Sequence, residues 1–177
     1  MAAINDAQRF LKTLSSKFPD NDPAKANNAV MIILILTNGV WRVVMNVERR
    51  KNDKHEWGFP GGNIDNSDVN AWEAAKRELF EETNHVFSMN HWKRNTEVKF
   101  TLTSSQGHKT RFYAGIYAPP NPYCMKGNPC NREVVFVEYP RVSEIMRAFE
   151  GNMRLKCGKF ELPVRPCMWV LAAAFKK

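Results

Sequence analysis

Residues 57–85 are WGFPGGNIDNSDVNAWEAAKRELFEETNH, and this stretch decides how the rest of the chain is interpreted. Its first part is a turn-rich segment around Gly61 and Gly62. Its second part, residues 71–83, contains no glycine or proline and is dominated by Ala, Glu, Lys, Arg and Leu, which predicts a helix. Asn70, or a polar residue shortly before it, can cap the N-terminus of this helix, and Asn84 tolerates the left-handed conformation that follows a helix end.

Three carboxylates share one face of the predicted helix. Glu78, Glu81 and Glu82 stand at positions i, i+3 and i+4, which brings their Cβ atoms within roughly 6 Å of one another. Such carboxylates repel, and their pKa values rise unless a positive charge lies among them. Arg77 can neutralise one of them and a divalent cation can neutralise more, and oxygen ligands favour a hard ion such as Mg²⁺ or Mn²⁺.

A Glu-rich helix face is in most proteins a solvated surface stabilised by Glu–Lys and Glu–Arg pairs. The turn at Gly61 and Gly62 favours a functional site here, because a backbone without Cβ atoms can approach an ion or a phosphate closely. The combination predicts a metal-dependent phosphate site.

These residues resemble the Nudix box, whose pattern is Gly, five residues, Glu, seven residues, Arg-Glu-aliphatic, one residue, Glu-Glu, one residue, Gly, aliphatic. The half that runs from Arg77 to Glu82 matches fully, and the segment that ends at Gly62 resembles the usual lead-in. The departures are Asp68 in place of the first Glu, eight residues rather than seven between Asp68 and Arg77, Asn84 in place of the last Gly, and His85 in place of the final aliphatic residue.

The resemblance implies a pyrophosphohydrolase that uses Mg²⁺ or Mn²⁺. Glu78, Glu81 and Glu82 would hold the ion, helped by a backbone carbonyl near Gly61. Arg77 would pair with Glu81 or a neighbouring carboxylate and fix its conformation. A carboxylate would orient or deprotonate the attacking water. Glu81 and Glu133 are candidates, and Glu138 is a weaker one whose commoner role is surface charge.

A charged stretch, ERRKNDKHE at residues 48–56, leads into the glycine turn. It is either a solvated loop or a phosphate-binding rim. In the second interpretation Arg49 is the preferred substrate contact, because a guanidinium binds phosphate through two parallel hydrogen bonds. Arg50 and Gly62 complete the predicted substrate-binding set.

The order of predicted elements indicates an α/β fold, an α/β/α sandwich over a mixed sheet, which the Nudix resemblance also implies. A near-continuous apolar run at residues 30–36 is typical of a strand buried on both faces. The other predicted elements are strands at 40–47, 97–104, 109–117 and 133–139, helices at 5–17, 142–151 and 167–175 (the last within a flanking segment, 164–176), and a loop at 119–130. The first and last helices can cover the sheet or form a dimer interface.

Composition limits the remaining choices. The 177 residues suit one domain, 1–177, and the net charge of +8 favours polyanionic partners. No apolar run approaches a membrane span, and the N-terminus lacks the plan of a signal peptide, so we expect a cytoplasmic protein. The four cysteines, 124, 130, 157 and 167, lack zinc-site spacing and are expected to be free thiols in a reducing compartment.

Two classes of function follow. The first is Mg²⁺-dependent hydrolysis of a diphosphate linkage in a phosphate-rich small molecule or a capped RNA: a nucleotide, a nucleotide derivative or an RNA 5′ cap, with a diphosphoinositol polyphosphate ranked lower. The second is a non-catalytic Nudix module that binds a nucleotide or RNA. Trp92, Phe112, Tyr117 and Tyr123 are the aromatic residues that could stack on a base, although core packing is the commoner role of such residues.

Overall fold

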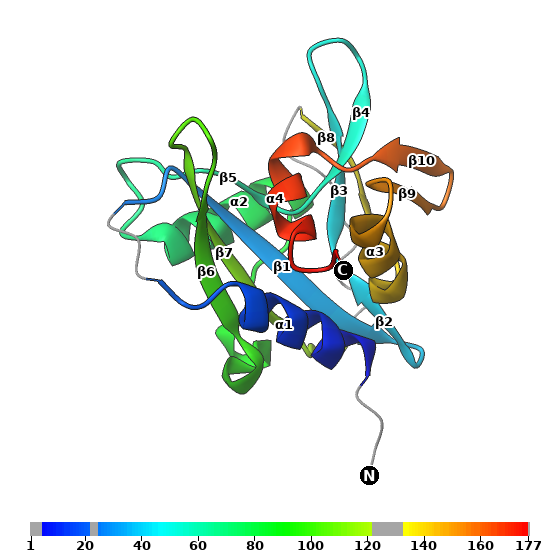
Figure 1. Ribbon diagram of the computed structural model, residues 1–177. Coiled ribbons are helices and arrows are strands. Elements are labelled where there is room, and N and C mark those ends of the chain that lie inside the picture. Colours follow the sequence, from blue (N-terminus) through cyan, green and yellow to red (C-terminus); the bar gives the residue numbers. More distant parts are fainter. Residues whose placement is uncertain (1–4, 22–24, 122–132, 177) are drawn as a thin grey trace.

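The main sheet of the protein is mixed, as predicted (Figure 1). The structure is a computed structural model that describes residues 5–21, 25–121 and 133–176. Its strand order is β2-β1-β7-β6, and the short strand β5 also pairs with β1. β1 and β7 are parallel, whereas the other pairs are antiparallel. The strands are β1 (Asn28–Thr37), β2 (Val40–Val43), β5 (Gly61–Asn63), β6 (Val98–Thr103) and β7 (Lys109–Ile116).

Strand β1 is buried on both faces, and its alternation creates the two helical layers. Val30, Ile32 and Leu34 belong to one core cluster with α1 (Asp6–Lys17) and α3 (Val142–Glu150). Its other buried residues, among them Met31 and Ile33, belong to a second cluster with α2 (Ala71–Thr83). Because successive side chains of a strand point to opposite faces, β1 contributes to both layers of the predicted sandwich.

The N-terminal helix covers the sheet. Asn5 caps α1 through a capping box with Gln8, and the apolar face of the helix is buried against the first core cluster. The rings of Phe10 and Phe175 lie 5.2 Å apart, so the two ends of the chain pack together over the same face. The helix predicted at 167–175 is wrong in extent, because the chain there forms a 3₁₀ turn, Pro166–Met168, and a short helix α4, Trp169–Ala172.

A second sheet, of order β4-β3-β8, lies beside the main one and was only partly predicted. The predicted strand 40–47 is in fact two strands, because Val44 still donates its N–H to Ile33 O (3.0 Å) whereas Met45 already pairs with Glu138. The charged stretch 48–56 is not all loop, because its two ends extend the hairpin strands β3 and β4. The strands of this sheet are β3 (Met45–Arg49), β4 (His55–Gly58) and β8 (Val134–Glu138).

A hairpin that the sequence did not predict, β9 (Arg154–Cys157) and β10 (Phe160–Pro163), supports the second sheet. Trp57 of β4 is fully buried, and its Nε1–H donates to Leu155 O of β9 at 2.8 Å. This hydrogen bond links the hairpin to the second sheet. Cys157 and Cys167 are free thiols, and Cys124 and Cys130 lie outside the described residues. Within the described ranges, no helix combines the length and apolar character needed to cross a membrane.

The packing of α1 can be tested by Phe10→Ala. Phe10 is fully buried in the first core cluster, so its truncation should lower the free energy of unfolding by about 3–5 kcal/mol in urea denaturation. Lys12→Ala is the control, because Lys12 lies on the exposed face of the same helix and its substitution should leave stability nearly unchanged. Equal stability of the two variants would show that α1 does not belong to the core.

Candidate active site

The helix that carries the three box carboxylates, α2, begins and ends where the sequence predicted. Asn70 Oδ1 accepts a hydrogen bond from Glu73 N at 2.9 Å, and Asn84 ends the helix with a φ of 56°. Ala75 and Leu79 are fully buried against β1. The face that carries Glu78 and Glu82 is turned toward the Gly61-Gly62 turn and the second sheet, as the contacts of these two side chains show.

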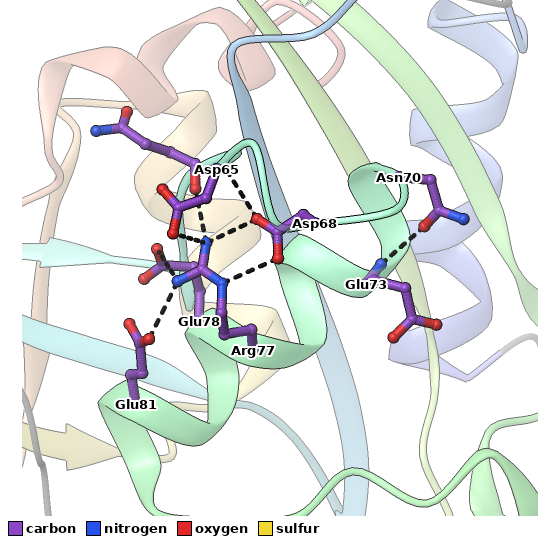
Figure 2. A network of polar contacts seen from close by, with 8 residues as sticks. Asp65, Asp68, Asn70, Glu73, Arg77, Glu78 and Glu81 are labelled. Atoms are coloured by element: carbon purple, nitrogen blue, oxygen red, sulfur yellow. Dashed lines mark hydrogen bonds and ion pairs between the residues drawn. The ribbon is translucent and has the colours of Figure 1, made fainter.

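Arg77 is the centre of a polar network at the start of this face (Figure 2). Its Nε and Nη2 donate to the two oxygens of Asp68 at 3.0 and 2.9 Å, and its Nη1 donates to Glu78 Oε1 and Glu81 Oε1, each at 3.1 Å. Nη2 also donates to the carbonyl of Asn63 at 2.9 Å. These partners raise the pKa of Arg77, and the Arg77 guanidinium lowers the pKa of Asp68.

The two departures in the loop before α2 offset one another. Asp68 is a shorter acid than the Glu of the pattern, but the loop is one residue longer. Asp68 N donates to Asp65 O at 3.0 Å, and Asp65 N donates to Asp68 Oδ2 at 2.8 Å, so the loop closes into a compact turn. This turn brings the shorter carboxylate to Arg77, to which it is hydrogen-bonded through both oxygens.

Gly62 makes room for the carboxylate of Glu78. A Cβ atom at Gly62 would lie 2.5–2.7 Å from the carboxyl carbon and oxygens of Glu78, too close for any other residue type without displacement of that side chain. Burial raises the pKa of Glu78, and Arg77 opposes the rise. The second glycine of the turn therefore leaves the space that the carboxylate of a predicted metal ligand occupies.

Glu82 is buried, with 2% of its surface exposed. Its Oε1 accepts a hydrogen bond from Gly61 N at 2.7 Å, and its Oε2 accepts one from Asn46 Nδ2 at 3.0 Å. Burial, followed by the negative charge of Glu48, holds the pKa of Glu82 well above its ordinary value. Asn46 and Gly61 belong to different sheets, so Glu82 lies at the junction between them.

Glu48 is a residue of this site that the sequence analysis missed. It lies on β3 two residues after Asn46, so strand alternation directs both side chains to the face that meets α2. It is 3% exposed, and its Oε2 lies 3.5 Å from Arg165 Nη1 without a hydrogen bond. A Cβ atom at Gly58 would collide with that oxygen, and burial raises the pKa of Glu48. Recognising residues 45–49 as a strand would have revealed Glu48.

Two of the predicted substrate residues, Arg49 and Arg50, lie in the β3–β4 hairpin, and the third, Gly62, lies in β5. Arg50 Nε lies 3.9 Å from Glu56 Oε1, and the charge of Arg50 acts on Glu48. Arg49 is exposed, next in sequence to Glu48, and its N–H donates to Glu133 O at 2.7 Å. The exposed Glu133 contributes to the raised pKa values of Glu48 and Glu82, so it lies near this cluster. The functional roles of Arg49, Arg50 and Glu133 stay predictions.

Three of the four aromatic candidates for base stacking belong to the core. Trp92, Phe112 and Tyr117 are 4%, 1% and 1% exposed, so their faces pack against other side chains. Tyr123 lies outside the described residues.

The side chains of the site are of the type that binds a hard divalent cation, although their carboxylates do not converge on one point. Within residues 5–21, 25–121 and 133–176, no three acidic, His or Cys side chains are arranged to hold a metal ion as they stand. The reason is that Arg77 binds Glu78 and Glu81, whereas Glu82 turns to Gly61 and Asn46. All the candidate ligand atoms are oxygens. Gly62 leaves space for the Glu78 carboxylate, and a cation would reduce the repulsion between Glu82 and the carboxylates near it.

The buried carboxylates predict how the stability of the metal-free protein depends on pH. The pKa values of Glu48 and Glu82 are raised in the folded state above the ordinary 4.5, so the folded state binds these protons more tightly than the unfolded chain. Their contribution to stability is complete below the unfolded-state pKa and is lost as pH rises through the folded-state values. We expect the free energy of unfolding, measured with urea in EDTA, to fall as the pH rises above the ordinary carboxyl value of 4.5.

Glu48→Gln and Glu82→Gln should each flatten this fall, because an amide does not titrate. Glu73→Gln is the matched control, since Glu73 lies on the same helix outside the cluster, 2.9 Å from Lys76. If both buried-site variants showed the same pH dependence as wild type, the effect could not come from these two carboxylates.

Comparisons with known proteins agree with this geometry. The family model of the NUDIX domain matches residues 25–154. A Caenorhabditis elegans Ap4A hydrolase in a binary complex has a TM-score of 0.57 and 16% identity, with 84% of this chain and 94% of that chain covered. The NUDIX domain of Shewanella oneidensis NrtR, complexed with ADP ribose, has a TM-score of 0.55 and 15% identity, with 92% and 94% covered.

A Nudix hydrolase from M. smegmatis, RenU, has a TM-score of 0.52 and 17% identity, with 84% of this chain and 80% of that chain covered. At such identities these structures show a shared fold. No curated protein matches the chain. The family model covers well over half of the sequence and includes the whole Arg77–Glu82 site, and on this basis the chain belongs to the NUDIX domain family.

Proposed function

We propose that this protein is a Mg²⁺-dependent hydrolase, with Mn²⁺ as an alternative ion, that cleaves a diphosphate linkage in a nucleoside diphosphate joined to another group. Membership of the NUDIX domain family supports Nudix-type pyrophosphohydrolase chemistry. The observation that carries the proposal is the complete set of Arg77, Glu78, Glu81 and Glu82, with Glu78 seated against Gly62 and Glu82 buried beside Gly61. A module that only bound nucleotides would have no need of all three carboxylates.

The box residues divide into ligands and one positioning residue. Glu78, Glu81 and Glu82 would hold the ion, with the carbonyl of Gly61 as a further ligand. When bound, the ion would neutralise phosphate charge and stabilise the leaving oxygen. Arg77 restrains Glu78 and Glu81 through hydrogen bonds of 3.1 Å, so it limits where these carboxylates can move.

Two carboxylates are candidates for orienting the attacking water. Glu81 has a side chain that is 46% exposed, so solvent reaches it. Glu133 is exposed at the start of β8, close enough to Glu48 and Glu82 to influence their pKa values. Glu81 is part of the carboxylate face of α2, and Glu133 lies near that face at the start of β8.

The substrate would be a phosphate-rich small molecule. The net charge of +8 favours polyanions, and Arg49, Arg50 and Gly62 are the proposed contacts. ADP ribose is the first compound to test, because the NUDIX domain of NrtR binds it in a structure with the same fold. Dinucleoside polyphosphates, capped RNA and diphosphoinositol polyphosphates complete the panel.

Glu82→Gln should abolish turnover while the fold is retained. A Gln amide oxygen can still accept from Gly61 N, and Asn46 can rotate its amide so that Oδ1, which has no hydrogen-bond partner, accepts from the new NH₂ group. Loss of the carboxylate should lower activity by about 100-fold or more. The measurement is product analysis by mass spectrometry over the panel with Mg²⁺, with Glu73→Gln as the active control. Binding of a nucleotide without cleavage of any compound by the wild type would instead indicate a non-catalytic module.

Gly62→Ala tests the seat of Glu78. The added methyl group would lie within 2.7 Å of the Glu78 carboxylate and displace it, so turnover of the substrate identified above should fall by about tenfold or more. Asn63→Ala is the neighbouring control, because it keeps the backbone carbonyl to which Arg77 donates. Unchanged turnover in Gly62→Ala would show that the position of Glu78 does not matter for catalysis.

A further inference from the structure

Arg165 reaches the candidate active site from the C-terminal segment, far from the box in sequence. Its backbone N–H donates to Trp57 O at 2.8 Å, and the preceding Val164 forms a bridge with Trp57, so its main chain is fixed along strand β4. Its Nη1 lies 3.5 Å from Glu48 Oε2, and its side chain is 30% exposed. The guanidinium of Arg165 therefore faces the Glu48 carboxylate, and part of its side chain is exposed to solvent.

The guanidinium of Arg165 differs from those of the other inward-pointing arginines. Arg77 makes five side-chain hydrogen bonds, and Arg111 makes three, so both have structural partners. Among the described residues, the Arg165 guanidinium has its ion pair with Glu48 but no hydrogen-bond acceptor. An arginine carries five N–H donors in a fixed planar arrangement, and a ligand can use donors of Arg165 that no described residue uses.

The ion pair of Glu48 and Arg165 is poorly arranged to stabilise the fold. Charge-assisted hydrogen bonds have lengths of about 2.7–2.9 Å, whereas this contact is 3.5 Å long and leaves Glu48 Oε2 without a donor. A buried ion pair that lacks good hydrogen bonds does not recover its desolvation cost. Gly58 accommodates the Glu48 carboxylate, because a Cβ atom at this position would collide with Glu48 Oε2 unless that side chain moved.

The guanidinium of Arg165 is a positive charge among carboxylates, so a phosphate bound to it would depend on Mg²⁺ to offset their repulsion. Glu48, Glu56 and Glu133 all act on its guanidinium, and Glu48 in turn acts on Glu82 of α2. Glu48 thus stands between Arg165 and the face that would hold the ion. A phosphate carries more charge than one carboxylate and offers oxygens that match both prongs of the guanidinium.

We propose that Arg165 binds the substrate phosphate adjacent to the one held at the α2 carboxylates, and that Glu48 is the counter-ion that keeps the guanidinium in place when no substrate is bound. This rests on the proposed function and extends it. A ligand then needs two linked phosphates to engage both sides of the site. The protein should therefore discriminate a diphosphate from a monophosphate through Arg165.

The test is the Mg²⁺-dependent binding of inorganic pyrophosphate and of orthophosphate, measured by calorimetry. We expect wild type to prefer pyrophosphate by about tenfold or more, and Arg165→Ala to lose that preference through weaker pyrophosphate binding while orthophosphate binding is unchanged. Arg165→Lys keeps the charge but not the planar pair of donors and should be intermediate. The control is Arg154→Ala, because Arg154 is exposed on β9 and has no carboxylate within 4.0 Å among the described residues.

Wild-type pyrophosphate affinity in Arg165→Ala would overturn the proposal, as would a wild type without preference for pyrophosphate. Arg165→Ala leaves Glu48 buried and unpaired, so the variant can lose stability. The double variant Glu48→Gln/Arg165→Ala removes both charges and should regain the wild-type unfolding midpoint while pyrophosphate binding stays weak. Recovery of that binding in the double variant would make Arg165 a structural counter-ion and overturn the proposal.

The same measurements separate this inference from the proposed function. Arg165-dependent pyrophosphate binding without cleavage of any compound in the panel would overturn the hydrolase proposal and support the phosphate contact. Cleavage with the same KM in wild type and Arg165→Ala would support the hydrolase and overturn the contact.

Discussion

The buried carboxylate of Glu82 is the interaction on which the rest of the site depends. It accepts hydrogen bonds from Gly61, next to the main sheet, and from Asn46, in the second sheet, so α2 can dock only where both sheets meet. The same position is unfavourable in electrostatic terms, because Glu48, Glu78 and Glu133 all raise its pKa. The fold accepts a cluster of like charges at its centre, and such a cluster is typical of sites whose function requires a cation.

Arg77 and Glu82 hold the α2 carboxylates by different means. Arg77 binds Glu78 and Glu81 from the solvent side and can exchange these partners, since its strongest contact is the two-pronged one with Asp68. Glu82 is held by the backbone N–H of Gly61 and by the buried amide of Asn46. The arrangement leaves two adjustable carboxylates and one fixed carboxylate on a single helix face, which suits an ion whose coordination is completed by substrate oxygens.

The parts of the fold that follow from local chemistry were predictable from the sequence. The bounds of α2 depend on Asn70, Asn84 and a run of good helix formers, and β1 depends on a continuous apolar run. The break at Val44 could not be predicted, because it reflects the pairing of Met45 with Glu138, which is distant in sequence. The burial of Glu48 was missed for the same reason, since a charged stretch looks like loop until the hairpin partner Glu56 is known.

The arginines nearest the box in sequence are not the only ones that lie near its carboxylates. Arg49 lies one residue beyond Glu48 in β3 and stays a predicted phosphate contact, whereas Arg165 is brought to Glu48 by the packing of the C-terminal segment on β4. Arg165 also lies outside residues 25–154, the part of the chain that the NUDIX domain model describes. The box therefore accounts for the general chemistry, whereas discrimination between phosphate ligands can come from a segment that the family pattern does not include. For this reason the contact between Glu48 and Arg165, rather than the box itself, is where the substrate preference of this chain should be sought.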